Sequence, residues 1–501
     1  MYNSSIILKR RLYDVLLQGN DLVVEVIEEP REHRQVIAQA GSGKTQRIAE
    51  LIADSVATGT PPGSIVATTY GVQAAQELRE RILLVAGQRL GPMPGLSQMT
   101  VGTIHSVCLG LLKRHLPRYI SYRLLTEAQV YLLVKENYHA LGLDRVRLVD
   151  GPHAGDPLER TAWDLRAYLD VLTVLREGDV DWGKMPAPLK ESCRRFKHLM
   201  RRERALDHTG LLHQALHALG DTDDEHCRRL RAHIADNVRA LYVDEYQDVN
   251  PIQERLIRAF VDLGVAVTTV GDGNQAIYGW RGCDVRYVTS FADRYHARVE
   301  RLDTNYRSSP GVITAAHHLL GSQAGEQAMT AGGHQVTEAG DLQAGQFDNL
   351  QEEADYIVGR IQDMIGTPFQ DRLDDPPRGL TYSDVAVLCR SVRQSAGAIV
   401  EALTAAGIPC RVSGLGGLFA APEVRAVVAS FLFLADRPEL VREGGKVVGR
   451  RVVTAGDVVQ AWRDADLGLS AAETAGGAAY LVEQKARYGQ KLVGAGGDGN
   501  G

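Results

Sequence analysis

Hydrophobic and polar positions along the first hundred residues follow two repeating patterns. Residues 36–38 and 64–71 contain short apolar runs that predict buried strands. Each run leads through a polar or glycine-rich turn into a stretch with apolar residues at helical spacing, over 46–59 and 72–87. This strand–helix–strand–helix order predicts the start of a parallel α/β sheet.

A third strand-like stretch, 100–112, includes the polar residues Thr103, His105 and Ser106. Polar residues at strand ends of a parallel sheet face the ligand crevice, so these three side chains are candidates for a binding site.

From about 111 to 235 the pattern changes to helices rich in Arg and His. The α/β pattern resumes directly afterwards, with apolar strands predicted near 240–243 and 266–270, so the helical stretch is interpreted as an insertion. Its basic run RRFKHLMRRER at 194–204 is typical either of a solvated helix face or of a phosphate-contacting surface, and both interpretations stay open.

The second half predicts another α/β unit. Its expected elements are a strand from 298 with a helix after it, a helix over 350–366, a strand over 383–391, a helix over 395–407 and a strand over 408–414. Beyond 436 the chain becomes rich in Gly, Val and Asp, and its final VGAGGDGNG is typical of a disordered tail.

Composition narrows the class of protein. With 501 residues, 44% of them apolar and 24% charged, the chain has room for about three or four globular domains. A net charge of -6 excludes a generally basic nucleic-acid coat, so any DNA path must be local.

The six cysteines are far apart without a CxxC pair, which argues against a disulfide framework, a zinc ribbon or an iron–sulfur cluster and favours a reducing cytoplasm. The charges of the N-terminus do not fit a secretory signal and the apolar runs are too short to span a bilayer, so we expect no membrane role.

The sequence AQAGSGKT at 38–45 has the pattern of a phosphate-binding loop. Small residues at 41–43 allow backbone N–H groups to surround an anionic oxygen at a helix start. Lys44 would neutralise the β and γ phosphates, and the Thr45 hydroxyl would hold Mg²⁺. The strict pattern has glycine where this chain has Ala38. A plain glycine-rich turn is the alternative, but it predicts no particular residue after the glycines.

Two further strands end in polar groups that suit catalysis. Asp244 and Glu245 follow the apolar ALYV, which places the pair at the end of a buried strand, although most acidic pairs are only surface charges. There, Asp244 would hold a metal ion and Glu245 would take a proton from the attacking water. The next strand leads into a glycine-rich loop that carries Gln275, Tyr278, Trp280 and Arg281. A loop Trp beside Arg suits a flat group that stacks on it.

In this order the motifs resemble those of the UvrD/Rep-like superfamily 1 DNA helicases, over roughly residues 36–435. The segments that look like successive family motifs are AQAGSGKT (38–45), TTYGVQAAQEL (68–78), GTIHS (102–106), VDEYQD (243–248), VGDGNQAIYGWRG (270–282) and LDTNYRS (302–308). The resemblance implies an α/β fold of two RecA-like P-loop domains with parallel sheets, the second of them incomplete. The implied domains are 1–110 with 236–297 (first RecA-like domain), 111–235 (inserted helical domain), 298–435 (partial second RecA-like domain) and 436–501 (start of a second insertion, or a disordered tail).

The resemblance also implies a role for each matching residue. ATP would be bound by Ala38, Gln39, Ala40, Gly41, Ser42, Gly43, Lys44 and Thr45, with Tyr306 against the adenine. Mg²⁺ would be held by Thr45 and Asp244. The catalytic groups would be Lys44, Glu245, Gln275 as γ-phosphate sensor and Arg307 as arginine finger. Single-stranded DNA would lie along Tyr70, Thr103, His105, Tyr278, Trp280 and Arg281.

The chain departs from the family pattern in three places. No glutamine-bearing adenine motif precedes the phosphate-binding loop, and GVQ at 71–73 replaces the usual Thr-Asn-Lys run. No segment after 436 resembles the family's motifs V and VI, which indicates a truncated helicase, a chain completed by a partner polypeptide, or a remnant. We therefore expect an ATP-dependent helicase or 3′ to 5′ translocase on single-stranded and duplex DNA, acting in repair or recombination. The alternative is a catalytically weak ATP- and DNA-binding remnant or subunit. A helicase–nuclease motor has little support, because no nuclease-like carboxylate–Lys cluster is evident.

Overall fold

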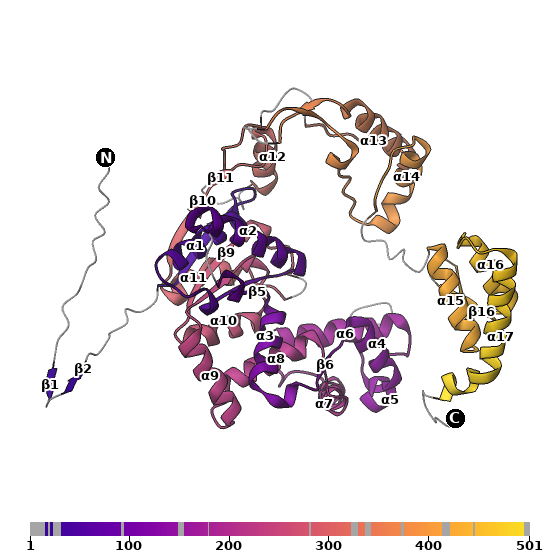
Figure 1. Ribbon diagram of the computed structural model, residues 1–501, viewed down its shortest axis with the longest axis horizontal. Coiled ribbons are helices and arrows are strands. Elements are labelled where there is room, and N and C mark those ends of the chain that lie inside the picture. Colours follow the sequence, from indigo (N-terminus) through magenta and orange to yellow (C-terminus); the bar gives the residue numbers. More distant parts are fainter. Residues whose placement is uncertain are drawn as a thin grey trace. The chain divides into compact units, whose positions relative to one another are not determined.

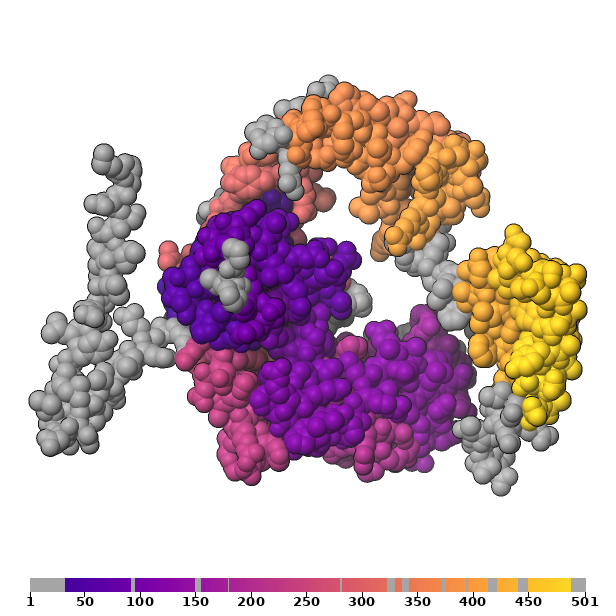
Figure 2. Space-filling view, viewed as in Figure 1, coloured from indigo at the N-terminus to yellow at the C-terminus, as the bar shows by residue number. Residues whose placement is uncertain are grey.

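The computed structural model describes residues 16–18, 21–23, 32–91, 95–148, 155–178, 180–279, 282–321, 329–335, 342–371, 375–412, 421–443 and 446–494, and uncertain residues are grey in Figures 1 and 2. The chain divides into two compact units, Met1–Leu342 and Gln343–Gly501. Trp280, Arg281 and the glycine-rich end from 495 lie outside the described residues. Within the described ranges, no helix is long and apolar enough to cross a membrane.

A six-stranded parallel sheet forms the centre of the first unit. Its strands are β3 (Arg34–Ala38), β4 (Ile65–Thr69), β5 (Thr100–Thr103), β8 (Ala240–Val243), β9 (Ala266–Gly271) and β10 (Arg298–Leu302). The spatial order is β10-β3-β9-β8-β4-β5, and every neighbouring pair is parallel. The parallel α/β sheet predicted from the sequence is confirmed.

Helices cover both faces of this sheet. One face carries α1 (Lys44–Ala57) and α2 (Val72–Leu90), whose apolar stripes pack on it, and the other lies among α3 (Ile104–His115), α8 (His208–Gly220), α9 (Glu225–Asn237), α10 (Pro251–Asp262) and α11 (Arg286–Tyr295). Fully buried residues such as Ile48, Ile52 and Ile82 stabilise the first layer by about 1.5–3 kcal/mol each. The strand-like stretch 100–112 was predicted too long, because only its first four residues pair with β4 and the rest begins α3.

The middle part of the helical segment between β5 and β8, residues 123–206, has a core of its own around Tyr168 and Phe196. It comprises α4 (Glu127–Glu136), α5 (Tyr138–Leu141), α6 (Ala162–Glu177) and α7 (Ala187–Arg202), with the paired strands β6 (Arg123–Leu124) and β7 (Ala205–Leu206) (Figure 1). Helix α7 carries the basic run: it buries Phe196 and Leu199 and exposes its cations, which leaves both interpretations of that run open.

The remaining elements of the first unit are short. They are the hairpin of β1 (Leu16–Gln18) and β2 (Asp21–Val23), the parallel pair β11 (Thr304–Asn305) and β12 (Thr330–Ala331), and α12 (Pro310–Leu320). Strand β10, assigned to the second domain by the sequence-based division, pairs with β3 in the sheet of the first unit. The other limits of the four expected domains stay predictions.

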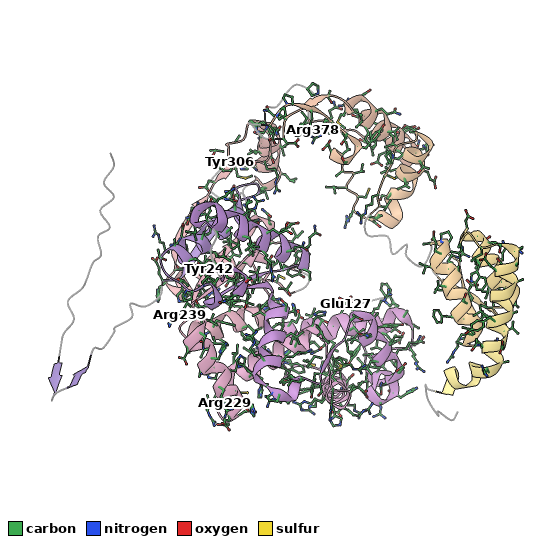
Figure 3. All side chains as sticks on the ribbon, in the orientation of Figure 1. Glu127, Arg229, Arg239, Tyr242, Tyr306 and Arg378 are labelled. Atoms are coloured by element: carbon green, nitrogen blue, oxygen red, sulfur yellow. The ribbon has the colours of Figure 1, made fainter. Side chains whose placement is uncertain are left out.

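The second unit is mainly helical. Its elements are α13 (Leu350–Met364), β13 (Pro368–Phe369), β14 (Arg378–Gly379), α14 (Val392–Ala405), α15 (Pro422–Leu434), β15 (Glu439–Glu443), β16 (Lys446–Arg451), α16 (Ala455–Asp464) and α17 (Ala471–Gly494). Regular elements thus extend to residue 494, through most of the segment for which a disordered tail was one expectation. Arg378, which belongs to β14 and is labelled in Figure 3, donates hydrogen bonds to the carboxylates of Asp371 and Asp384.

Two strands predicted for the second unit do not form. Residues 383–391 and the described part of 408–414 contain no strand, although the helix between them is present as α14. An alternating or apolar pattern does not supply a pairing partner, and a strand exists only when its N–H and C=O groups pair with a neighbour. Leu388, which the pattern would bury, is 94% exposed.

Candidate active site

The six motifs singled out in the sequence all follow the carboxyl ends of strands in one sheet. The phosphate-binding loop follows β3, and the other five follow β4, β5, β8, β9 and β10. Parallel strands bring their carboxyl ends to one edge, where α/β proteins bind ligands. Because β3 lies between β10 and β9, the phosphate-binding loop is flanked by the segments that follow those two strands.

The loop after β3 has the backbone shape that phosphate binding needs. Gly41 and Gly43 adopt left-handed φ angles of 69° and 86°, which residues with a side chain rarely adopt. Ser42 closes the turn, since its hydroxyl donates to the carbonyl of Gln39 at 2.6 Å. Helix α1 starts directly afterwards, so its unpaired N–H groups face the concave side of the loop.

Asn305, which lies in the motif LDTNYRS but received no predicted role, connects this loop to the segment after β10. Its Nδ2 donates to the carbonyl of Ala40 at 2.9 Å, and its Oδ1 accepts from the backbone N–H groups of Arg307 and Ser308, both at 2.8 Å. The N–H of Tyr306 donates to the carbonyl of Gly41 at 3.0 Å. The backbone of the Tyr306–Arg307 segment therefore lies against the phosphate-binding loop, while both side chains are exposed (Figure 3, Tyr306).

Three predicted catalytic side chains meet beside α1. The Nζ of Lys44 lies 3.0 Å from Gln275 Oε1 and 3.4 Å from Glu245 Oε2. Glu245 has a left-handed backbone with φ 50°, which costs a non-glycine residue about 1–2 kcal/mol. The turn after β8 therefore holds Glu245 in a strained conformation, as is typical of functional sites.

The residues beside Glu245 fit a magnesium ion. Burial and the neighbouring Glu245 raise the pKa of Asp244 to about 7, and the same causes raise the pKa of Asp248 to about 6. A divalent cation would stabilise the charged form of such carboxylates. Among the described residues, the buried oxygens Thr69 Oγ1 and Asp248 Oδ1 have no hydrogen-bond partner.

No cluster of three or more His, Cys, Asp or Glu side chains preassembles a metal site in the described part of the chain.

The predicted DNA-contacting residues lie in different surroundings. Tyr70 and Tyr278 stack on each other, with ring centroids 5.7 Å apart and planes at 12°. Thr103 caps α3, because its side chain accepts from the N–H of Ser106 at 3.2 Å. His105 lies edge-on to His208 at 5.2 Å, whereas Trp280 and Arg281 lie outside the described residues. Burial, reinforced by His208, lowers the pKa of His105 to about 4, so its ring is neutral at pH 7.

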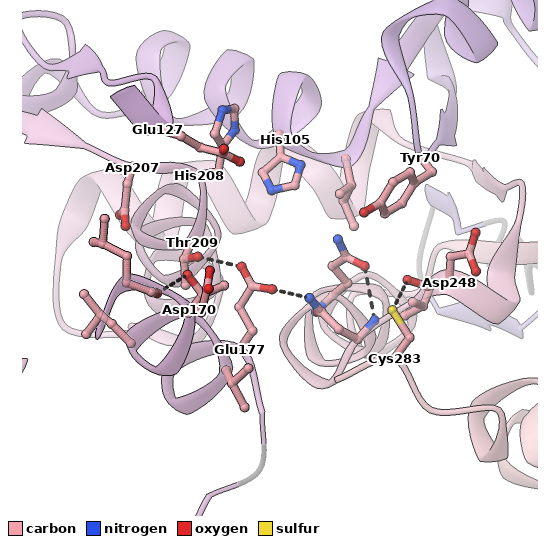
Figure 4. Close-up of a pocket in the computed structure, with 18 of the residues that line it drawn as sticks. Tyr70, His105, Glu127, Asp170, Glu177, Asp207, His208, Thr209, Asp248 and Cys283 are labelled. Atoms are coloured by element: carbon pink, nitrogen blue, oxygen red, sulfur yellow. Dashed lines mark hydrogen bonds between the residues drawn. The ribbon is translucent and has the colours of Figure 1, made fainter. Parts of the chain in front are cut away.

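A cavity of about 980 Å³ separates these strand ends from the inserted helices (Figure 4). Tyr70, His105 and Asp248 line it from the sheet side, and residues of α4, α6 and α8 line the other side. Glu177 joins the two sides, since its carboxylate accepts from Thr209 Oγ1 at 2.5 Å and Asn250 Nδ2 at 2.7 Å. No sequence pattern marks Glu177, whose pKa is raised by burial.

Comparison with known proteins agrees with this geometry. Residues 20–296 match the family model of the UvrD/REP helicase N-terminal domain, and residues 301–439 match that of the UvrD-like helicase C-terminal domain. The chain is 29% identical over 455 residues to the ATP-dependent DNA helicase UvrD2 of Mycobacterium tuberculosis, covering 85% of this chain and 59% of the relative. It is 28% identical over 435 residues to DNA helicase II of Escherichia coli, covering 83% and 54%. The chain thus spans little more than half the length of these relatives. Because the first match alone covers more than half of its residues, the chain belongs to the UvrD/REP helicase family.

Proposed function

We propose that the chain binds ATP with Mg²⁺ and hydrolyses it to move along single-stranded DNA. The observation that carries this proposal is the meeting of Lys44 with Gln275 and Glu245 at the start of α1. A cation, a carboxylate and an amide within hydrogen-bonding range suit the transfer of a γ-phosphoryl group to water.

Each residue has a role in this proposal. Lys44 neutralises the β and γ phosphates while the backbone at Gly41–Gly43 surrounds them, and Glu245 takes the proton of the attacking water. Magnesium, held by Thr45 and Asp244, would neutralise the phosphate charge. Gln275 contacts the γ-phosphate, and Arg307 approaches the same group as an arginine finger.

The DNA path is proposed along Tyr70, Thr103, His105 and Tyr278, with Trp280 and Arg281 beside it. Stacked rings such as Tyr70 and Tyr278 provide a flat surface that accepts any base, at about 1–3 kcal/mol per stacked base. The neutral state of His105 suits a stacking or hydrogen-bonding contact rather than a phosphate ion pair. The names of the relatives, ATP-dependent DNA helicase and DNA helicase II, support duplex unwinding as the output. Movement from 3′ to 5′ and a role in repair or recombination complete the proposal.

The deciding experiment is ATP hydrolysis by the purified chain with and without a single-stranded oligonucleotide. We expect DNA to stimulate turnover and Lys44→Ala to abolish it, because the γ-phosphate loses its cation. Retained ATP and DNA binding without turnover in the wild-type chain would contradict the proposal. That result would favour the alternative of a weak binding remnant or a subunit that needs a partner polypeptide. Unwinding of a duplex with a 5′ tail but not a 3′ tail would contradict the polarity.

A further inference from the structure

Five residues form a closed ring of polar contacts at the carboxyl ends of β3, β8 and β9. In order around the ring, the contacts are Lys44 Nζ to Glu245 Oε2 at 3.4 Å, Gln247 Nε2 to Glu245 Oε2 at 2.6 Å, Asp272 N to Gln247 Oε1 at 3.0 Å, Gln275 Nε2 to Asp272 Oδ2 at 2.8 Å, and Lys44 Nζ to Gln275 Oε1 at 3.0 Å. Two members, Gln247 and Asp272, have no role in the proposed function. Both are buried, at 2% and 5% exposure.

The chemistry of Gln247 is specific to an amide. One end of the side chain must donate to the carboxylate of Glu245, and the other must accept from a backbone N–H, which fixes the orientation of the amide. A carboxylate in its place could accept but not donate, and an apolar side chain could do neither. The site is also tight, because a Cβ added to Gly271 would lie 2.8 Å from the amide oxygen of Gln247.

Nucleotide binding would change which contacts hold the ring together. The phosphates compete for Lys44, and its contacts with Glu245 and Gln275 are the ones that phosphate binding would replace. Within the ring, the connection between Glu245 and Gln275 then runs only through Gln247 and Asp272.

We infer that Gln247 and Asp272 are positioning residues that keep the base Glu245 and the sensor Gln275 in a fixed relation after Lys44 turns to the phosphates. This inference rests on the proposed function and extends it. The loop that carries Gln275 continues to Tyr278, which stacks on Tyr70, so the same two residues also connect the proposed DNA path to the base.

The test compares Gln247→Met, which removes both hydrogen bonds at similar volume, with Gln247→Glu, which keeps the acceptor for Asp272. The control is Gln35→Met in β3, since Gln35 is 3% exposed and its amide donates to a backbone carbonyl of α11 instead. We expect kcat to fall about 10- to 100-fold in both Gln247 variants, as when a catalytic group is misplaced by an ångström. The Glu variant should fall at least as far as the Met variant, because its carboxylate faces that of Glu245.

Measurements of KM and of ligand binding show whether a fall in kcat comes from lost positioning or from lost folding. Affinity for a non-hydrolysable ATP analogue and for single-stranded DNA should change less than about threefold. A threefold change alters the binding free energy by less than half as much as a tenfold change does. A kcat within about twofold of wild type in Gln247→Met would overturn the inference. An equal fall in kcat in Gln35→Met would also overturn the inference, because the replacement of any buried glutamine would then cause the loss.

A wild-type chain without DNA-stimulated turnover would refute the proposed function separately. In that case a double-mutant cycle in urea unfolding still tests the ring, combining Gln247→Met with Glu245→Ala, because the bond from Gln247 Nε2 to Glu245 Oε2 joins two side chains. Residues that share a hydrogen bond lose less together than the sum of their single losses, whereas additive losses would overturn the inference.

Discussion

The contact between Gly41 and Asn305 predicts unequal effects for two alanine substitutions in the same loop. Gly41→Ala and Gly43→Ala both place alanine in a left-handed conformation, at a cost of about 1–2 kcal/mol each. They differ in what the new methyl group meets. At residue 41 it would lie 2.7 Å from three atoms of the Asn305 side chain, whereas at residue 43 the nearest atom is Gln46 Cβ at 3.8 Å.

The extra cost at residue 41 follows from the hydrogen bonds of Asn305. This side chain is 2% exposed and makes three hydrogen bonds with backbone groups, to the carbonyl of Ala40 and from the N–H groups of Arg307 and Ser308. If the methyl group displaces this side chain, each lost hydrogen bond lowers the free energy of unfolding by about 0.5–1.5 kcal/mol. We therefore expect Gly41→Ala to be about 1.5–4.5 kcal/mol less stable than Gly43→Ala.

Urea unfolding without nucleotide measures this difference, because it separates the stability of the loop from its role in phosphate binding. Asn305→Ala serves as the second arm of a double-mutant cycle. In that background the two glycine variants should agree to within about 1 kcal/mol, since the clash is removed. Equal stability of Gly41→Ala and Gly43→Ala in the native background would refute the reasoning.

Two further predictions concern buried charge and pH. Arg294→Ala should destabilise the chain by about 3–5 kcal/mol, because it leaves the carboxylate of Glu254, 5% exposed, without its cation. Arg286→Ala on the same helix, where the arginine is exposed and paired with an aspartate, should cost less than about 1 kcal/mol, and equal losses in urea unfolding would contradict this account. His105 has a folded-state pKa of about 4 against 6.5 when unfolded, so the folded state binds fewer protons and stability is lost as pH falls from 6.5 towards 4. The free energy of unfolding falls by about 3 kcal/mol at most. Solvent screening makes the fall smaller, because the ring is partly exposed. His105→Gln should flatten the stability profile in this window, whereas an unchanged slope would refute the assignment.

Strands β4, β8 and β9 of the first sheet could be predicted from the sequence because they are short apolar runs that end in polar motifs. Runs such as 64–71 predict both the strand and which of its ends faces the ligand. The parallel arrangement then places Lys44, Glu245 and Gln275 at one edge.

Long-range contacts could not be predicted in this way. Asn305 lies within a motif-like stretch, but nothing local indicates that its side chain contacts Ala40, more than two hundred residues earlier. Glu177 ends an ordinary amphipathic helix, and its partners Thr209 and Asn250 come from other elements. The failed strands at 383–391 and 408–414 have the same cause, because local pattern does not determine pairing.

The pairing of β10 with β3 has a practical consequence for dissecting the protein. A fragment cut at 297, the end of the first domain in the sequence-based division, would lose β10 and expose the backbone edge of β3 along residues 34–38. It would also lose Asn305, and with it the support of the phosphate-binding loop. An autonomous nucleotide-binding fragment therefore has to extend through the Asn305 segment, and the border after Leu342 is the place to end it.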